Sequence, residues 1–418
     1  MRNAGRYALL SVVGLSCLVF ALASGPTCAE FQLELSSYKT QYLPHEPLYV
    51  KVAVRNVGPS DSRILTILDP EVGFMKFEIA APGEEPHKYD PGVAIEIVKP
   101  EEGAALTLGP GESYSARADL TEELCREEAG RKTVLSKPGM YVIRAVYELP
   151  ADMPTGPIAL WSNDLTVVVT KAKGDDLKVS NLLGKLEDKW GYSKEQLACY
   201  EELVTKYPKS KYALYARYHL AGKHSWDGMD AYRGEQRGFE SLKKAAEMFA
   251  SISRDAGNTP IGLKAADRSG SWFGSIGNIK ESQRMFEKAF SHPAATDDDR
   301  IEAVSHLNLL EGGHWQWQSE FVPEKRRTEL HLPLRWFAKP FGFSVEYNSA
   351  ANTATASGPR FKCSFRPGDS RIIINGKERT GCKTWLDKGE VRISIPVIHA
   401  LLAEHYQTTR FDWLVRSD

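Results

Sequence analysis

The chain has 418 residues, of which 26% are charged and 42% are hydrophobic, and its formal net charge is −1. This composition is typical of folded globular protein and excludes wholesale disorder, collagen and a long coiled coil. The balanced charge excludes nucleic-acid binding through overall basicity. Because the chain has only one long apolar segment, a polytopic membrane protein is also excluded. A chain of this length corresponds to about two to four domains.

The long apolar segment lies at the N-terminus and predicts a signal peptide over residues 1–29. Arg2 and Arg6 precede an apolar stretch over 8–23, and small residues follow as far as Ala29. This order is typical of a cleaved secretory signal, and the apolar stretch is short for a membrane anchor. We therefore expect a secreted or extracytoplasmic protein, in the periplasm or at the cell surface, with no integral membrane segment after cleavage.

Residues 30–172 predict an antiparallel β-sandwich. Short segments such as 48–55 alternate apolar and polar side chains and are separated by turns with glycine and proline. The stretch 70–99 is rich in proline, glycine and glutamate and predicts long loops. His45-Glu-Pro-Leu-Tyr near the start and Pro138-Gly-Met-Tyr near the end resemble motifs of bacterial immunoglobulin-like domains. That resemblance implies a fold and no particular function.

Residues 175–312 change to a helical period. Ser193 and Gln196 form a capping-box pattern at the start of one helix. Further helices are expected over 236–253, 261–276, 278–291 and 297–311.

The helices of this segment form pairs that resemble tetratricopeptide-like repeats. Pro260 and Pro293 end two similar stretches and lie 33 residues apart, close to the 34-residue period of that family. The longer spacing from Pro208 to Pro260 requires an insertion around 223–238. The alternative is a plain helical bundle.

Residues 320–418 contain two similar segments and predict an internal duplication. Leu332-Pro-Leu-Arg precedes a predicted helix, Gly342 and a strand, and Ile395-Pro-Val precedes a second predicted helix with no clear glycine after it. These motifs, with an intervening Asn375-Gly, resemble the N-terminal-like domain of copper amine oxidases over about 331–415. The chain as a whole is therefore predicted to be a multidomain α+β protein, with a β-sandwich, a helical TPR-like repeat domain and a small duplicated α/β module.

The resemblance to copper amine oxidases covers an accessory module and implies no copper chemistry. The catalytic domain of that family makes its quinone from a tyrosine in an Asn-Tyr context and binds copper through a His-x-His pair, and neither pattern occurs in this sequence. We therefore expect no metal, no cofactor and no catalytic residues, and His399 and His405 are expected to be structural.

Four cysteines remain after the predicted cleavage, which are Cys125, Cys199, Cys363 and Cys382. Export favours disulfide formation. Cys363 and Cys382 lie in one short β-rich segment and are the expected pair. Cys125 and Cys199 lie in different predicted domains, and free buried thiols are the alternative for them.

Two sets of side chains are predicted to bind a partner, with a place in the core as the alternative for each residue. Trp315 and Trp317 alternate along the chain, so both face one side, as suits sugar stacking or sealing of one domain against the next. The first set would line a groove in the helical repeats and consists of Tyr212, Tyr215 and Arg217. The second set would lie near the start of the C-terminal module and consists of Trp315, Trp317 and Arg335.

These observations predict an exported, non-catalytic bacterial envelope protein. It would bind a protein or peptide through its helical repeats, a cell-wall polymer through its C-terminal module, or both. That module is net positive, whereas residues 30–319 are net negative. The alternatives are a protease inhibitor that uses the loop over 81–99, a carbohydrate-binding protein that uses the tryptophan pair, and an enzyme with a site between domains.

Overall fold

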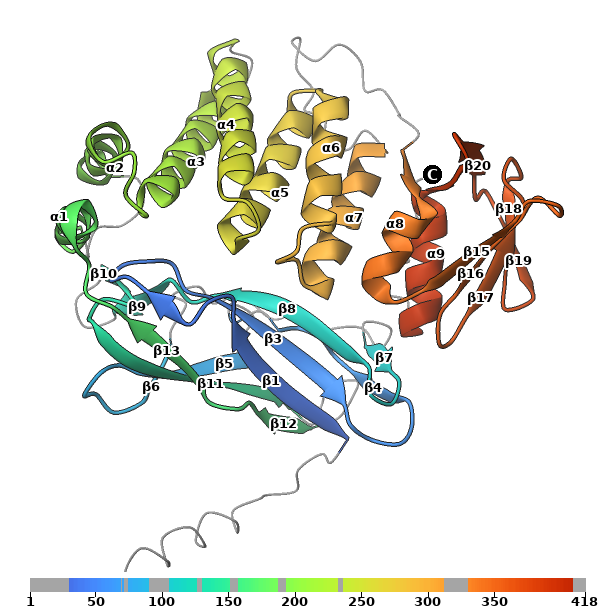
Figure 1. Ribbon diagram of the computed structural model, residues 1–418, viewed down its shortest axis with the longest axis horizontal. Helices are drawn as coiled ribbons and strands as arrows, with labels where there is room; N and C mark the ends of the chain where they lie inside the picture. Colours follow the sequence, from blue (N-terminus) through green and yellow to red (C-terminus); the bar gives the residue numbers. More distant parts are fainter. Residues whose placement is uncertain are drawn as a thin grey trace, which may run out of the picture.

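The computed structural model describes residues 30–68, 70, 74–89, 105–125, 130–150, 157–186, 193–231, 236–311 and 330–408. The predicted signal peptide lies outside this range. The structure is a mixed α+β fold with several antiparallel sheets (Figure 1). Strands come first along the chain, a row of helices follows, and a second set of strands with helices ends the chain. Within the described ranges, no helix is both long and apolar enough to cross a membrane.

The first part of the chain, residues 30–169, forms two larger sheets and two short strand pairs. One sheet has the order β1-β3-β8, and the other has the order β2-β13-β11-β5-β6, with β12 also paired to β11. The short pairs are β4 with β7 and β9 with β10. The strands are β1 (Phe31–Ser37), β2 (Gln41–Tyr42), β3 (Tyr49–Asn56), β4 (Ser62–Ile64), β5 (Met75–Ala80), β6 (His87–Lys88), β7 (Leu106–Leu108), β8 (Ser113–Asp119), β9 (Glu122–Cys125), β10 (Gly130–Thr133), β11 (Gly139–Leu149), β12 (Ile158–Trp161) and β13 (Leu165–Val169).

The two larger sheets of the first part share one hydrophobic core. Alternate residues point inward along each strand, so Leu33 and Val52 of one sheet and Phe77 and Tyr141 of the other are buried. Each fully buried side chain of this size contributes about 1.5–3 kcal/mol of hydrophobic stabilisation. The expectation of long loops over 70–99 is wrong where β5 lies, because this segment alternates buried and less buried residues and pairs with β11.

The helical part, residues 174–311, places each helix beside the next along the chain. The expected helices are confirmed within one or two residues, because local capping fixes their starts. Ser193 and Gln196 form the predicted capping box, and Thr259 caps the helix that begins at Pro260. The helices are α1 (Gly174–Leu183), α2 (Lys194–Lys206), α3 (Ala213–Ala231), α4 (Gln236–Asp255), α5 (Pro260–Ser275), α6 (Ile279–Phe290) and α7 (Asp297–Glu311).

The extra residues around 223–238 lengthen two helices. α3 has 19 residues and α4 has 20 residues, so most of the expected insertion is helical. Only residues 232–235, between the two helices, lie outside the described range. The longer spacing from Pro208 to Pro260 therefore reflects a longer pair of helices, because α3 continues through residues 223–231.

The C-terminal part, residues 330–408, contains a five-stranded antiparallel sheet in the order β15-β16-β17-β18-β19 and a three-stranded sheet in the order β14-β21-β20. In Figure 1 its helices continue the row of α3 to α7 beyond α7. The elements are β14 (His331–Pro333), α8 (Leu334–Ala338), the 3₁₀ helix η3 (Lys339–Phe341), β15 (Ser344–Asn348), β16 (Thr353–Ser357), β17 (Lys362–Phe365), β18 (Arg371–Ile374), β19 (Lys377–Thr380), β20 (Thr384–Asp387), β21 (Glu390–Ser394) and α9 (Ile395–Tyr406).

The two similar segments of this part pair with each other. Strand β14 runs antiparallel to β21, and each strand leads through a proline into a helix. Gly342 ends the first helical stretch in the left-handed conformation at φ 69°, and Gln407 ends the second at φ 46°. The second copy therefore keeps the left-handed turn without glycine, at the cost of a backbone conformation that non-glycine residues adopt less readily.

The expected disulfide between Cys363 and Cys382 is wrong. Both residues are free thiols buried in the hydrophobic core, Cys363 on β17 and Cys382 just after β19. Each occupies the position of a small apolar side chain, a common role for a free cysteine. Burial raises the pKa of Cys363 to about 12, so its thiol stays protonated. Cys199 on α2 is also a free buried thiol, whereas the side chain of Cys125 lies outside the described residues.

Candidate functional site at the junction of the three parts

The N-terminus of α7 is attached to strand β8 of the first part. Asp297 accepts hydrogen bonds from the backbone N–H and the hydroxyl of Ser115, at 2.9 and 2.8 Å. The hydroxyl of Tyr114 donates to Asp298 at 2.6 Å. Acidic residues in the first turn are favourable for a helix, and here the same carboxylates also bind a sheet edge 182 or more residues away in sequence.

The third aspartate of this turn forms a buried ion pair. Arg117 of β8 donates to Asp299 at 2.7 Å, and the side chains are 14% and 8% exposed. The other oxygen of Asp299 accepts from the backbone N–H and the hydroxyl of Thr296, which caps α7 in return. The pair therefore joins a helix start to the β1-β3-β8 sheet, and both carboxylate oxygens of Asp299 accept hydrogen bonds.

A second charged contact joins the first part to the C-terminal part. The guanidinium of Arg360 donates to Asp61 at 3.1 Å, to Glu112 at 2.6 Å and to the backbone carbonyl of His405 at 2.7 Å. Its side chain is 6% exposed. A Cβ at Gly109 would lie 2.6 Å from this guanidinium, so a larger residue there would force the end of the Arg360 side chain to shift. Arg360 thus holds α9 against the turn before β8.

A third contact lies between the first part and α5. Lys264 donates to Asp119 at 2.7 Å, and its ammonium lies near the rings of Tyr49 and Tyr218. Although burial opposes it, the charge of Lys264 holds the pKa of Asp119 below its usual range. The helical part is therefore joined to the sheet at α5 as well as at α7.

A cavity of about 570 Å³ lies where the three parts meet. The first part contributes residues of β3 and of the start of β8, and the helical part contributes the loop before α7 and its first turn. The C-terminal part closes the cavity with η3 and the end of α9. The lining residues are Lys51, Gly111, Glu112, Ser113, Ser115, Pro293, Ala295, Asp297, Arg300, Pro340, Phe341, Gly342, Pro359, His405 and Tyr406.

Two tyrosines predicted to line a helical groove contact the first part instead. Tyr212 is 1% exposed, and its hydroxyl donates to the backbone carbonyl of Pro44 at 2.5 Å. The half-buried Tyr215 donates to Glu46 at 3.3 Å. The groove interpretation is therefore wrong for Tyr212, which belongs to the core, and Tyr215 helps to hold α3 on the sheet.

The other predicted binding residues lie apart from one another. Arg217 is half-buried on α3 and pairs with Asp255 of α4 at 2.8 Å. Arg335 is exposed on α8. Trp315 and Trp317 lie outside the described residues. Within the described part of the chain, the predicted binding residues therefore do not form one site, and the junction cavity contains none of them.

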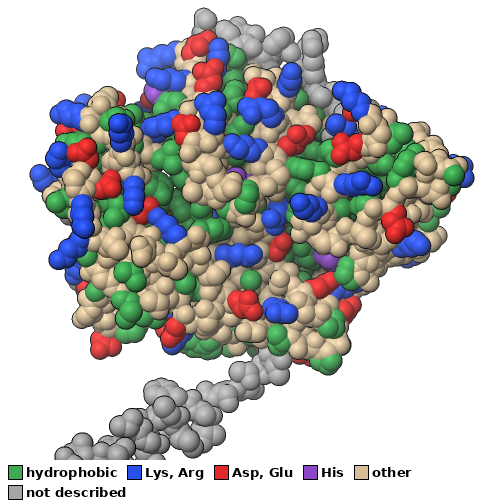
Figure 2. Space-filling view, viewed as in Figure 1, with side chains coloured by type: hydrophobic (Ala, Val, Ile, Leu, Met, Phe, Trp, Pro, Cys, Tyr) green, Lys and Arg blue, Asp and Glu red, His purple; other side chains and the backbone are tan. Residues whose placement is uncertain are grey.

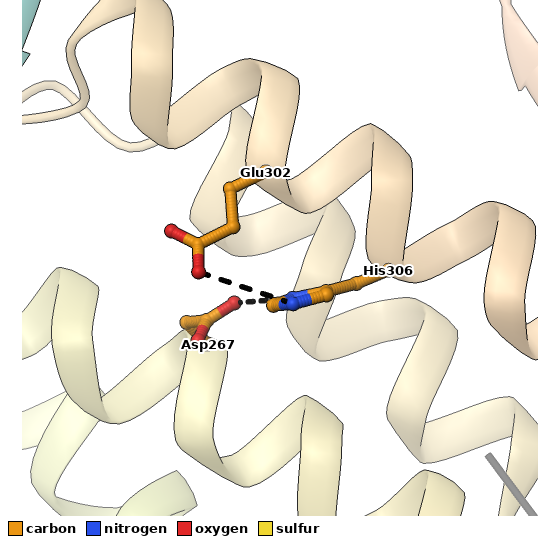
Figure 3. Close-up of side chains that lie close together, drawn as sticks. All are labelled: Asp267, Glu302 and His306. Carbon is orange, nitrogen blue, oxygen red and sulfur yellow. Dashed lines mark hydrogen bonds and ion pairs between the residues drawn. The ribbon is translucent and has the colours of Figure 1, made fainter. Parts of the chain in front are cut away.

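Three residues with metal-ligand side chains lie together on α5 and α7 (Figure 3). His306 Nδ1 lies 2.9 Å from Asp267 Oδ1, and its Nε2 lies 3.9 Å from Glu302 Oε1. Four-residue spacing places Glu302 and His306 on one face of α7. A group of two carboxylates and an imidazole can hold a divalent cation. Here the imidazole already contacts both carboxylates and, when it is protonated, balances the charge of one of them.

The titration of this cluster follows from its charges. Loss of water around its carboxylate, with the charge of Asp267 in addition, raises the pKa of Glu302 to about 7, although its side chain as a whole is 55% exposed. Burial alone would lower the pKa of His306, but the hydrogen bond and charge of Asp267 raise it above the usual histidine value. Glu302 and His306 are four residues apart, which is a local signal in the sequence. Asp267 lies more than 30 residues from both, so the sequence gives no sign that the three residues form a cluster.

Charged side chains of both signs are interspersed on the face of the molecule seen in Figure 2. This distribution does not favour a single large basic patch on that face. Ion pairs within the C-terminal part leave its net charge unchanged but occupy some of its cations, since Arg379 contacts Glu404 at 3.0 Å and Arg392 contacts Asp387 at 3.0 Å.

Comparison with known proteins gives no family for this chain. No family model matches it, and no curated protein matches it. Among solved structures, a β-glucosidase from Listeria innocua is 13% identical, with a TM-score of 0.19, over 34% of this chain and 16% of that chain. The sporulation control protein Spo0M from Bacillus subtilis is 12% identical, with a TM-score of 0.19, over 38% of this chain and 56% of that chain.

A CARDB domain from Pyrococcus furiosus, solved with di-metal ions, is 13% identical, with a TM-score of 0.16, over 34% of this chain and 87% of that domain. This chain thus spans about one sixth of the glucosidase and just over half of Spo0M. Likenesses of this size carry no argument about activity.

Proposed function

We propose that this chain is an exported, non-catalytic binding protein of the bacterial envelope, whose ligand occupies the junction cavity. In this proposal the first part is an immunoglobulin-like sandwich, the helical part is a TPR-like repeat domain and the C-terminal part is the duplicated module. The proposal of export is supported by the basic, apolar and small-residue pattern of residues 1–29.

The observation that carries the binding proposal is the composition of the junction cavity. Residues from all three parts line it. Cavities between domains are preferred ligand sites in proteins. Two of its polar pairs, Ser115 with Asp297 and Glu112 with Arg360, already form the contacts that join the parts. Side chains committed in this way hold the shape of a pocket and are poorly placed to exchange protons with a substrate.

This proposal moves the expected partner contact from the helical groove to the junction. Tyr212 and Tyr215 pack α3 against the first part, so they are not available to a partner at that end of the helical row. A protein, a peptide or a cell-wall polymer remains the proposed class of partner, and a segment of it would enter the cavity.

The proposal is tested with the mature protein, residues 30–418, as bait for envelope proteins and, separately, for purified cell wall. Ser113 is exposed and lines the cavity, so Ser113→Trp would fill part of it with an indole. Ser349, an exposed serine in the turn between β15 and β16, gives the matched control Ser349→Trp.

We expect capture by the wild type and the Ser349→Trp variant and loss of capture by Ser113→Trp, with unchanged circular dichroism in all three proteins. Equal capture by both variants would contradict a ligand site in the cavity. Sequencing of the secreted N-terminus, expected to begin at Glu30, tests export separately.

A further inference from the structure

The carboxylates of the junction cavity already accept hydrogen bonds from groups of the protein itself. Glu112 accepts from Arg360 at 2.6 Å and from the backbone N–H of Gly109 at 2.7 Å. Asp297 accepts both hydrogen bonds from Ser115. A ligand therefore meets two acidic side chains that each already accept two hydrogen bonds from the protein.

The hydrogen-bond donors of the cavity have fewer partners than its carboxylates. Lys51 on β3 is exposed and forms no hydrogen bond or ion pair with any described residue. The buried Nε–H of Arg300 has no partner in the described part of the chain, and another nitrogen of the same guanidinium lies 3.7 Å from Asp297.

His405 adds a third unused group. Its residue is 7% exposed, it lines the cavity, and its Nδ1 is buried without a hydrogen-bond partner among the described residues. Burial lowers the pKa of His405 to about 4, so the imidazole is neutral at pH 7, and its Nδ1 donates when it carries the proton. A buried polar atom left unpaired costs free energy, and a ligand that pairs with it after a rotation of the imidazole recovers that cost.

We propose that the junction cavity binds an oxyanion, a carboxylate or phosphate group carried by the ligand, through Lys51, Arg300 and His405. This inference rests on the proposed function for the location of the ligand and adds its chemistry. Hydrogen bonds from charged donors to carboxylate or phosphate oxygens are shorter and stronger than neutral ones. The rings of Phe341 and Tyr406 line the same cavity and offer apolar contact to the remainder of the ligand.

The test uses two probes on the mature protein by isothermal titration calorimetry at low salt. One probe is inorganic phosphate, and the other is a short peptide with a free C-terminal carboxylate, compared with the same peptide as its C-terminal amide. The cavity variants are Lys51→Gln and Arg300→Gln. Matched controls are Lys280→Gln on α6 and Arg254→Gln on α4, both at exposed positions outside the cavity.

At least one probe should bind, and each cavity variant should weaken its affinity roughly ten-fold to a hundred-fold, as expected for a hydrogen bond to a charged group. The controls should bind as the wild type does, and binding should weaken at high salt. Phosphate binding identifies a phosphate ligand, and peptide binding lost in the amide identifies a carboxylate. Because Lys51 is exposed, Lys51→Gln should fold, so the test stays valid even if Arg300→Gln fails to fold.

Absence of binding by both probes at millimolar concentration, or unchanged affinity in Lys51→Gln, would overturn the oxyanion site. The partner capture described above separates this result from failure of the proposed function. Capture lost in Ser113→Trp but kept in Lys51→Gln and Arg300→Gln would leave the cavity as the ligand site and remove the oxyanion. Capture kept in Ser113→Trp would remove both.

Discussion

The ion pair between Arg117 and Asp299 should be a principal stabilising contact between the sheet and the helices. Replacing Arg117 with methionine keeps the aliphatic length and removes the charge, which leaves Asp299 buried at 8% exposure without its cation. Breaking a buried pair in this way costs about 3–5 kcal/mol. Thr296 still donates two hydrogen bonds to the carboxylate, so we expect the lower end, about 3 kcal/mol.

The chain offers a matched control for this experiment. Arg144 of β11 pairs with Asp164 at the same distance, 2.7 Å, but the two side chains are 43% and 50% exposed. Exposed pairs contribute about 0–1 kcal/mol. Arg144→Met should therefore lower the free energy of unfolding by less than about 1 kcal/mol, although both variants lose an arginine from an antiparallel strand.

The assay is urea unfolding of the mature protein at neutral pH, followed by tryptophan fluorescence and by circular dichroism. Separate transitions by the two probes would show that unfolding is not two-state, and the free energy is then taken from the transition that Arg117→Met shifts. The double variant Arg117→Met/Asp299→Asn should recover part of the loss, because it removes the unpaired charge. Equal losses in Arg117→Met and Arg144→Met would refute the argument from burial.

Three further outcomes follow from buried or clustered titratable groups. Cys363 and Cys382 should resist iodoacetamide in the native protein and react after denaturation without reductant, and a disulfide-linked peptide in a non-reducing digest would contradict the structure. Burial lowers the pKa of His399 to about 4, so the unfolded state binds the extra proton between pH 6.5 and 4 and stability falls as the pH falls through this window. This loss reaches about 3 kcal/mol, and His399→Leu should flatten the acid limb of a plot of unfolding free energy against pH. For Glu302 the pH dependence of stability runs the other way, because its raised pKa makes the native state hold the proton, so stability falls as the pH rises from 4.5 to 7. Glu302→Gln should reduce that decline. An unchanged plot of unfolding free energy against pH would argue against the cluster with Asp267.

Local features of the sequence predicted most of the elements. The alternation of β3 and the capping box of Ser193 and Gln196 depend on neighbours a few residues away, and these elements were confirmed. The strand β5 was missed because nearby prolines and glycines masked a short alternation from Met75 to Ala80. The disulfide was mispredicted because nearness in sequence and an exported setting do not fix where two buried side chains point.

The contacts at the junction could not be predicted from the sequence, because they join residues that are far apart along the chain. Arg360 meets Asp61 across 299 residues and Glu112 across 248 residues. The three aspartates at the start of α7 carry a local signal, the favourable interaction with the helix N-terminus, which explains them without any partner. Their contacts with β8 depend on how the helical row docks on the sheet, and no periodicity or spacing in the sequence reports that docking.

A cavity built from three parts links ligand binding to the docking of those parts. Its donors come from β3, α7 and α9, so an oxyanion that contacts all three would bind only the docked arrangement. A ligand that binds one state stabilises that state in proportion to its concentration relative to its dissociation constant. Arg117, Lys264 and Arg360 already favour docking without ligand. Such preorganisation lowers the cost of binding, so under the proposed function these ion pairs contribute to affinity as well as to stability.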